Sequence, residues 1–266
     1  MARMPQVFVT TSWDDDDRTG LRVAELLSTH HLTGTFYVPT GRLGGDSLFT
    51  PDDLRTLVAT GFEIGGHTVS HAILTEISHS ECAREISDCK TTLQKILARE
   101  VTMFCYPKGR FHAGVVSAVQ QAGYRGARGT QLLSWVNTFP AFAMPITVQA
   151  FPHTRANYAR NLARLGEFRA LLRSSVDLAQ FKDWLSLGKS MFDRVLKKGG
   201  MWHLTGHPWE LEKLQLWQPL QEMLAYVSKR DGVQYVTNGQ LLEAVHGGAL
   251  AASETLQEKD PQSVAH

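Results

Sequence analysis

The chain has 266 residues, of which 43% are hydrophobic and 20% are charged, and its formal net charge at pH 7 is +1. This composition is typical of a globular protein with a substantial core, and the near-neutral charge gives no reason to expect nucleic acid or an anionic membrane as a partner. The three cysteines lack the paired spacing of a disulfide framework or a zinc knuckle. No apolar run is long enough to predict a membrane-spanning helix, and the N-terminus lacks a signal core. A soluble, cytoplasmic protein is therefore the expectation.

Strand-like and helix-like segments alternate along the first half of the chain. The strands are short runs rich in β-branched and aromatic residues, and the helices have apolar residues spaced three and four apart. Two helices also carry N-terminal signals, namely Pro51 followed by aspartates and a serine cap at Ser78 or Ser80. The predicted strands are 7–13, 34–39, 62–67, 103–107 and 124–129, and the predicted helices are 21–31, 51–60, 78–100 and 113–123.

The alternation continues in the second half. The pattern predicts strand 146–151, a long Arg-rich and mostly helical segment from about 154 to 198, strand 201–207, helix 210–230, strand 233–239 and helix 240–247. Residues 249–266 are polar and aperiodic and are expected to form a disordered tail. Seven or eight βα units predict a parallel sheet with helical crossovers, which at this length closes naturally into a barrel. Residues 1–248 are thus predicted to form one α/β domain, an irregular (β/α)7–8 barrel.

In such a barrel the chemistry lies at the carboxyl ends of the strands. Four consecutive aspartates, which begin at Asp14, follow the first predicted strand, and a cation or solvent must offset their mutual repulsion. His67 and His71 follow the third strand; on a helical turn they would lie about 5–6 Å apart at Cβ and could bind one ion. Such a pair is also common on surfaces and in cores. Imidazole and carboxylate donors together suit Zn²⁺ and its first-row neighbours.

Two further segments end predicted strands. In "FCYPKGRF", Pro107 fixes the chain and a glycine permits a sharp turn, so backbone N–H groups could face a substrate oxyanion. An ordinary βα turn would have a similar composition. In "MWHLTGH", alternation places His203 and His207 on one face of the strand. His207 should lie at the barrel mouth and could act as a general acid, whereas His203 lies deeper and fits a hydrogen-bonded core histidine.

Together these motifs resemble those of the polysaccharide deacetylase family (carbohydrate esterase family four), which are metal-dependent amide hydrolases on an irregular (β/α) barrel. The stretch "SWDD" is similar to the family's Thr-Phe-Asp-Asp motif, and "HTVSH" is similar to its His-(Ser/Thr)-x-x-His motif. The resemblance implies that Asp14 is the general base and that Asp15, His67 and His71 hold the metal. It covers roughly residues 7–245.

The later family motifs match less closely. Cys105 stands where the family has an arginine, and Lys108 stands where it has a tyrosine whose backbone N–H assists the oxyanion. Arg125 or Arg128 is a hypothetical substitute for the missing cation. The stretch "HLTGH" approximates the family's last motif, with His207 as the better candidate for the acid, and no segment is assigned to the fourth motif.

A cation would cancel much of the repulsion in the aspartate run and leave Asp16 and Asp17 as its solvated remainder. The resemblance implies removal of an N-acetyl or other N-acyl group from an amino sugar or glycan intermediate. A metal-bound water would be the nucleophile, Asp14 would accept its proton, and His207 would protonate the leaving amine. One divalent ion is expected, Zn²⁺ first, with Co²⁺, Ni²⁺ or Mn²⁺ as alternatives.

The expected substrate is a small or oligosaccharide N-acylated sugar, with neither nucleic acid nor membrane insertion involved. Two other functions stay open, a metal-independent cyclic-amide hydrolase of the same fold and a catalytically inactive barrel that binds a glycan. The residues expected to contact substrate are Tyr106, Pro107, Lys108, Arg128, His153 and Trp209.

Overall fold

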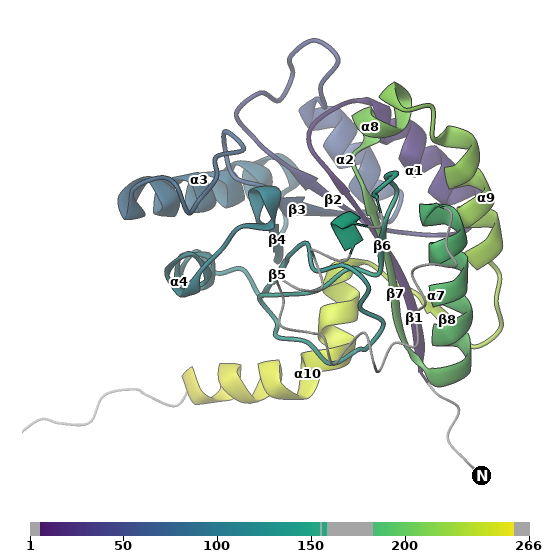
Figure 1. The fold of residues 1–266 in the computed structure, drawn as a ribbon. Helices are drawn as coiled ribbons and strands as arrows, with labels where there is room; N and C mark the ends of the chain where they lie inside the picture. The colour runs from purple at the N-terminus through teal and green to yellow at the C-terminus, as the bar shows by residue number, and fades with distance from the viewer. Residues whose placement is uncertain (1–5, 155, 159–182, 258–266) are drawn as a thin grey trace, which may run out of the picture.

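The structure is a computed structural model and describes residues 6–154, 156–158 and 183–257. Most of the predicted helical segment from about 154 to 198 lies outside these residues, and its last part forms helix α7 (Trp184–Lys198). A parallel sheet occupies the centre of the molecule, and helices cover it on both sides (Figure 1). The strands are β1 (Val7–Asp14), β2 (Thr35–Val38), β3 (Glu63–Gly66), β4 (Met103–Cys105), β5 (Gly126–Arg128), β6 (Val148–Gln149), β7 (Gly200–Gly206) and β8 (Val233–Tyr235).

The strands follow the order β5-β4-β3-β2-β1-β7-β6, and β8 pairs with β1. Residues 141–149 close the sheet between its two ends, mostly without regular structure. The N–H of Met144 donates to the carbonyl of Ala127 in β5, and the N–H of Thr147 donates to the carbonyl of His203 in β7. β6 then pairs in parallel with β7. The fold is therefore an irregular (β/α) barrel, which confirms the predicted fold class.

The helices in the first half begin where the sequence indicates. Thr50 and Asp53 form a capping box at the start of α2, and Ser78 caps α3. No helix among the described residues combines the length and the apolar character that a membrane crossing requires. Apart from α7, the helices in the described part of the chain include α1 (Thr19–Thr29), α2 (Pro51–Ala59), α3 (His79–Leu97), α4 (Ala113–Gln121), α8 (Pro208–Lys213), α9 (Trp217–Val227) and α10 (Asn238–Gln257).

The single helix predicted over 210–230 is wrong, because this stretch holds α8 and α9 with a break between them. Gln215 in the break has a left-handed backbone with a φ of 54°. Pro219 lies in the first turn of α9, where its missing N–H removes no helical hydrogen bond. The proline therefore favours a new helix start rather than continuation of the old one.

Helix α10 also departs from the prediction. It starts at Asn238, inside the predicted strand 233–239, and continues past Gly248 to Gln257. The alanines, leucines and glutamate of this stretch favour helix strongly, although their mixed order shows no clear periodicity. The predicted start of a disordered tail at residue 249 therefore falls within α10, and residues 258–266 lie outside the described part of the chain.

Alternation along β1 determines which of its side chains face the barrel interior. Phe8 packs there against residues of the other strands and of α10, and the period of two carries Thr10, Ser12 and Asp14 to the same face. Val7, Val9 and Trp13 point the opposite way, into a second hydrophobic cluster between the sheet and the outer helices. The last residue of β1, Asp14, therefore points into the top of the barrel.

The first turn of α10 closes the barrel interior below Asp14, away from the cavity. The fully buried side chain of Asn238 donates to Thr10 Oγ1 at 2.9 Å and accepts from the hydroxyl of Tyr37 at 2.8 Å. This network satisfies polar groups of β1 and β2 below the site and fixes the two strands relative to each other.

Candidate metal and active site

A cavity of about 340 Å³ lies at the carboxyl ends of the barrel strands. Of the residues that the sequence analysis singles out as site residues, all except Pro107 line it. They come from the ends of six strands, which are distant in sequence and meet because the sheet is parallel. Pro107 is buried and shapes the turn after β4 instead of contributing to the cavity wall.

Asp14 and Asp15 both line this cavity although neighbouring side chains of a strand point to opposite faces. The backbone of Asp15 is left-handed, with a φ of 80°, which ends β1 and turns the second carboxylate back toward the cavity. Aspartate tolerates this conformation better than most residues. Asp15 Oδ1 lies 3.5 Å from His71 Nε2 and 4.0 Å from His67 Nε2.

The two histidines lie close together, but not on the helical turn that their spacing predicts. The stretch from His67 to His71 is a loop after β3, in which Thr68 and His71 have left-handed φ values of 68° and 61°. The imidazole centroids are 4.8 Å apart, with the ring planes at 70°. Donor atoms of Asp15, His67 and His71 all lie within 4.8 Å of one another.

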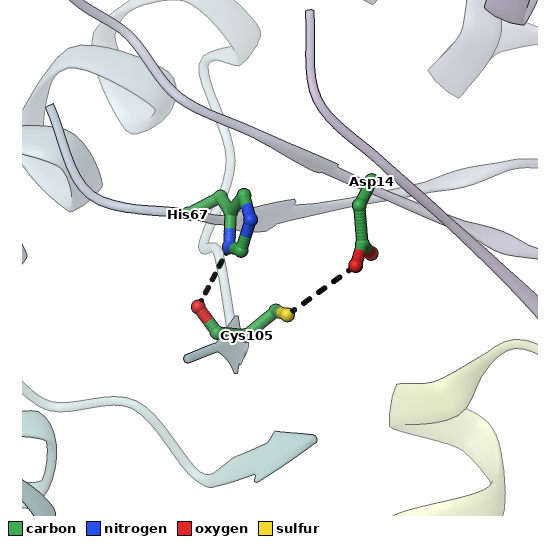
Figure 2. A group of neighbouring side chains, drawn as sticks. All are labelled: Asp14, His67 and Cys105. Carbon is green, nitrogen blue, oxygen red and sulfur yellow. Dashed lines mark hydrogen bonds between the residues drawn. The ribbon is translucent and has the colours of Figure 1, made fainter. Parts of the chain in front are cut away.

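His67 is prepared as a neutral ligand. Its Nδ1 lies 2.8 Å from the carbonyl oxygen of Cys105, so Nδ1 carries the proton and donates, and Nε2 is left free for a cation (Figure 2). Burial lowers the pKa of His67 to about 4, which keeps the ring neutral at pH 7. With the carboxylate of Asp15 and the imidazole of His71, this donor set fits a divalent cation.

Arg128 compensates the charge of Asp14. The guanidinium donates from Nη2 to Asp14 Oδ1, and both side chains are almost completely buried. Burial alone would raise the pKa of Asp14, but the charges of Arg128 and nearby histidines lower it to about 2. Of the two arginines considered from sequence, Arg125 pairs with Glu100 at 3.2 Å instead. Arg128 therefore supplies the cation next to the predicted base.

Cys105 explains how Arg128 reaches this position. The two residues are register partners on β4 and β5, so their side chains leave adjacent strands at the same level. The small thiol of Cys105 lies 3.9 Å from Asp14 Oδ2 (Figure 2). A larger side chain at residue 105 would compete with Arg128 for the space beside the carboxylate.

One short segment after β7 completes the site. Nδ1 of His207 donates to Glu210 at 2.7 Å, and its Nε2 faces Asp14 Oδ2 at 3.8 Å. Burial tends to lower the pKa of His207, but the Glu210 hydrogen bond and the charges of Asp14 and Asp15 outweigh it and raise the pKa. Trp209 donates from its indole nitrogen to Asp15 Oδ2 at 2.8 Å. Sequence reasoning missed Glu210, although its position three residues after His207 at a helix start was a usable signal.

His203 does not line the cavity. Its Nδ1 donates to the carbonyl of Pro145 at 2.9 Å, and its Nε2 lies 2.8 Å from the hydroxyl of Ser12. Burial lowers its pKa to about 3. This is the hydrogen-bonded core histidine that the sequence indicates, and it leaves His207 as the histidine available for acid chemistry.

The remaining wall residues have separate supports. The hydroxyl of Tyr106 donates to the carbonyl of Phe142 at 3.0 Å, and its ring stacks on Phe111. Lys108 is exposed and has a left-handed backbone. His153 Nε2 lies 2.9 Å from Gln149 Oε1.

The prediction that Asp16 is solvated is wrong. Its side chain is 1% exposed, and Oδ1 accepts from Arg42 at 2.7 Å. Asp17 is partly exposed and accepts from the backbone N–H of Thr19 at 2.8 Å at the start of α1, which is an ordinary turn contact. Each aspartate of the run therefore has its own contacts. Arg128 pairs with Asp14 and Arg42 pairs with Asp16. Asp15 faces the two histidines, and Asp17 binds the start of α1.

Comparison with known proteins confirms the resemblance seen in the sequence. Residues 3–127 match the family model described as polysaccharide deacetylase. Over 104 residues, 39% of this chain and 46% of the relative, the chain is 27% identical to the chitooligosaccharide deacetylase of Rhizobium leguminosarum bv. trifolii. It is also 27% identical over 106 residues to the peptidoglycan-N-acetylmuramic acid deacetylase PdaC of Bacillus subtilis (strain 168), covering 39% of this chain and 22% of that protein. The match therefore spans less than half the length of either curated relative.

The structural comparison extends over the whole chain. A crystal structure of a Mycobacterium smegmatis protein assigned as a polysaccharide deacetylase superposes with a TM-score of 0.65. The match covers 100% of this chain and 96% of that one at 15% sequence identity. At this identity the likeness shows a shared fold.

Proposed function

Because this chain belongs to the polysaccharide deacetylase family, whose model matches residues 3–127, we propose that it hydrolyses the N-acetyl or another N-acyl group of an amino sugar. The substrate is a glycan or a smaller N-acylated intermediate. One observation carries the proposal: an ionised, buried Asp14 lies between Arg128 and His207, directly beside three converging metal donors. A base, an acid and a cation site around one cavity are the components that amide hydrolysis requires.

Asp15, His67 and His71 would hold the cation. Two imidazoles and one carboxylate suit Zn²⁺ best and also accept Co²⁺, Ni²⁺ or Mn²⁺. When bound, the ion supplies Lewis-acid chemistry to the cavity, where it activates water and polarises the acyl carbonyl.

Asp14 accepts the proton of the attacking water. Arg128 keeps its carboxylate ionised throughout the neutral range and fixes Oδ1, so that Oδ2 is the oxygen left toward the cavity and His207. The low pKa of Asp14 makes it a weak base, and the transfer therefore requires an acidified water.

His207 donates a proton to the leaving amine. Its raised pKa favours the protonated ring that a general acid needs, and the hydrogen bond to Glu210 fixes the ring so that Nε2 is the donor toward the cavity. The backbone N–H of Lys108, in the turn after β4, is the proposed donor to the developing oxyanion.

The cavity wall suits a sugar ring. Trp209 and Tyr106 supply aromatic surface, and Lys108 and His153 supply polar groups. A volume of about 340 Å³ is at the small end of ligand sites, which fits one N-acylated sugar residue with any further chain outside.

The test is release of free acetate from a panel of N-acetylated sugars, chitooligosaccharides included, by protein loaded with Zn²⁺ or Co²⁺. Asp14→Asn should retain the metal and lose turnover by about 10²–10⁴-fold. Asp17→Asn makes the same charge change in the same aspartate run outside the cavity and should stay near wild type. Wild-type rates in Asp14→Asn would contradict the proposal, and no acetate from any sugar in the panel would exclude N-acetyl sugars as the substrate. Activity that survives complete chelation would instead favour the metal-independent hydrolase.

A further inference from the structure

The loop that carries the second histidine ligand is conformationally demanding. Thr68 and His71 both have left-handed backbones, which residues with a Cβ adopt rarely and only when their surroundings enforce them. The side chain of Thr68 is fully buried, and its hydroxyl has no hydrogen-bond partner among the described residues. Contacts from outside the loop must therefore hold it in this conformation.

Glu85 supplies those contacts from helix α3. Its Oε2 accepts from the backbone N–H groups of Val69 and Ser70 at 2.8 and 2.9 Å, and its Oε1 accepts from the hydroxyl of Ser70 at 2.8 Å. On the other side of the loop, the N–H of Gly41 donates to the carbonyl of Val69 at 2.8 Å. One carboxylate thus binds two consecutive N–H groups and a hydroxyl in the centre of the loop.

This contact matters more for His71 than for His67. The ring of His67 is buried and fixed directly by the carbonyl of Cys105. The side chain of His71 is 28% exposed, and within the described ranges its imidazole has no hydrogen bond that orients it; it approaches Asp15 and lies edge-on to the ring of His67. The position of the His71 ring therefore depends on the loop backbone that Glu85 holds.

Within the described part of the chain, the carboxylate of Glu85 binds only the loop. Its carboxylate forms no ion pair with a lysine or arginine there, and N–H and O–H donors of the loop satisfy it instead. Hydrogen bonds to an ionised acceptor are about twice as strong as those between neutral groups. A charged acceptor is therefore well suited to enforce two left-handed residues within one short loop.

We propose that Glu85 is a positioning residue of the metal site, which holds the His67–His71 loop so that His71 meets Asp15 and His67 around one cation. The inference rests on the cation site of the proposed function. Glu85 itself touches neither the cavity nor the donors, and it acts through Val69 and Ser70.

The test measures cation affinity, which does not depend on knowing the substrate. Glu85→Ala should weaken Zn²⁺ binding by roughly 10–100-fold, the usual cost of losing a contact behind a metal ligand. Glu85→Gln keeps one oxygen for the two N–H groups and should lose less. Glu81→Ala removes an exposed glutamate one turn earlier in α3 and should bind Zn²⁺ like the wild type. Affinities come from competition with a chromophoric chelator, and the visible spectrum of bound Co²⁺ should change in Glu85→Ala only.

Thermal unfolding of the metal-free proteins separates positioning from stability alone. Wild-type Zn²⁺ affinity and an unchanged Co²⁺ spectrum in Glu85→Ala would overturn the inference, whatever the change in melting temperature. If Glu85→Ala does not fold, Ser70→Ala, which removes only the hydroxyl contact, must show a smaller loss in the same direction. A wild-type protein that binds no cation would refute the metal site and this inference together. Absence of acetate release with Glu85-dependent Zn²⁺ binding would refute N-acetyl hydrolysis and leave this inference standing.

Discussion

The buried ion pair between Asp14 and Arg128 offers the sharpest quantitative prediction. The two side chains are 8% and 2% exposed, and Arg128 reaches across from β5 to the end of β1. Arg128→Met removes the charge but keeps an unbranched side chain in place of the aliphatic stem of the arginine. It leaves the carboxylate buried without its cation, which is expected to cost about 3–5 kcal/mol at pH 7.

The change of stability with pH shows whether Arg128 stabilises the ionised form of Asp14. In the wild type the pKa of Asp14 falls from 3.8 to about 2, and one pKa unit corresponds to about 1.4 kcal/mol. Asp14 therefore contributes about 2 kcal/mol of stability above its unfolded pKa, and this is lost as the pH falls toward 2. Without Arg128, burial becomes the dominant influence and raises the pKa of Asp14. In the variant, protonation of Asp14 is then stabilising, so its stability deficit should shrink as the pH falls from 7 to about 5.

The assay is urea unfolding of the metal-free proteins, followed by tryptophan fluorescence at both pH values. Arg125→Met is the matched control, since its pair with Glu100 is partly exposed and should contribute less than about 1 kcal/mol. Adding Asp14→Asn to Arg128→Met should recover most of the lost stability, because no charge is then left buried. An equal deficit at both pH values, or a deficit no larger than that of the control, would refute this account of the pair.

Three other predictions concern the surroundings of the site. Activity should fall as the pH rises through the raised pKa of His207. Glu210→Gln should move this fall to lower pH, and an unmoved profile of kcat against pH would contradict the role of Glu210. Trp209→Phe keeps the aromatic ring but removes the donor to Asp15, so Zn²⁺ affinity should drop about tenfold in a chelator competition assay. Asn238→Ala leaves buried hydroxyls of β1 and β2 without partners and should cost about 2–4 kcal/mol in urea unfolding, while Zn²⁺ affinity stays unchanged.

The sequence predicts the parts of this protein that depend on local pattern. Alternation of strands and helices predicts the parallel barrel, and the positions of Asp14 and His207 at strand ends predict that they share one cavity. The two-residue period of β7 likewise separates the deep His203 from the outer His207. Each of these inferences needs only the residues of one element and the rule that parallel strands end on the same side.

What the sequence does not predict depends on backbone conformations that residue type does not encode. The family resemblance implies that Asp14 and Asp15 share the site, but it does not reveal the left-handed backbone of Asp15. This backbone brings both carboxylates to one cavity, where an extended strand would have separated them. The left-handed Thr68 and His71 replace the predicted helical turn. Asp16 is buried and pairs with the distant Arg42, and no spacing rule relates the two residues.

The relation between Cys105 and Arg128 shows why a missing motif residue need not mean a missing function. A residue-by-residue comparison finds cysteine where the family has arginine, and from this alone the positive charge next to Asp14 would be judged missing. In the folded chain these two residues are opposite each other on adjacent parallel strands, at the same level of the barrel. A cation can therefore move from one strand to the next and still reach the same carboxylate, provided that the vacated position becomes small, as Cys105 is. The proposed function needs one buried positive charge beside Asp14, and Arg128 on β5 provides that charge.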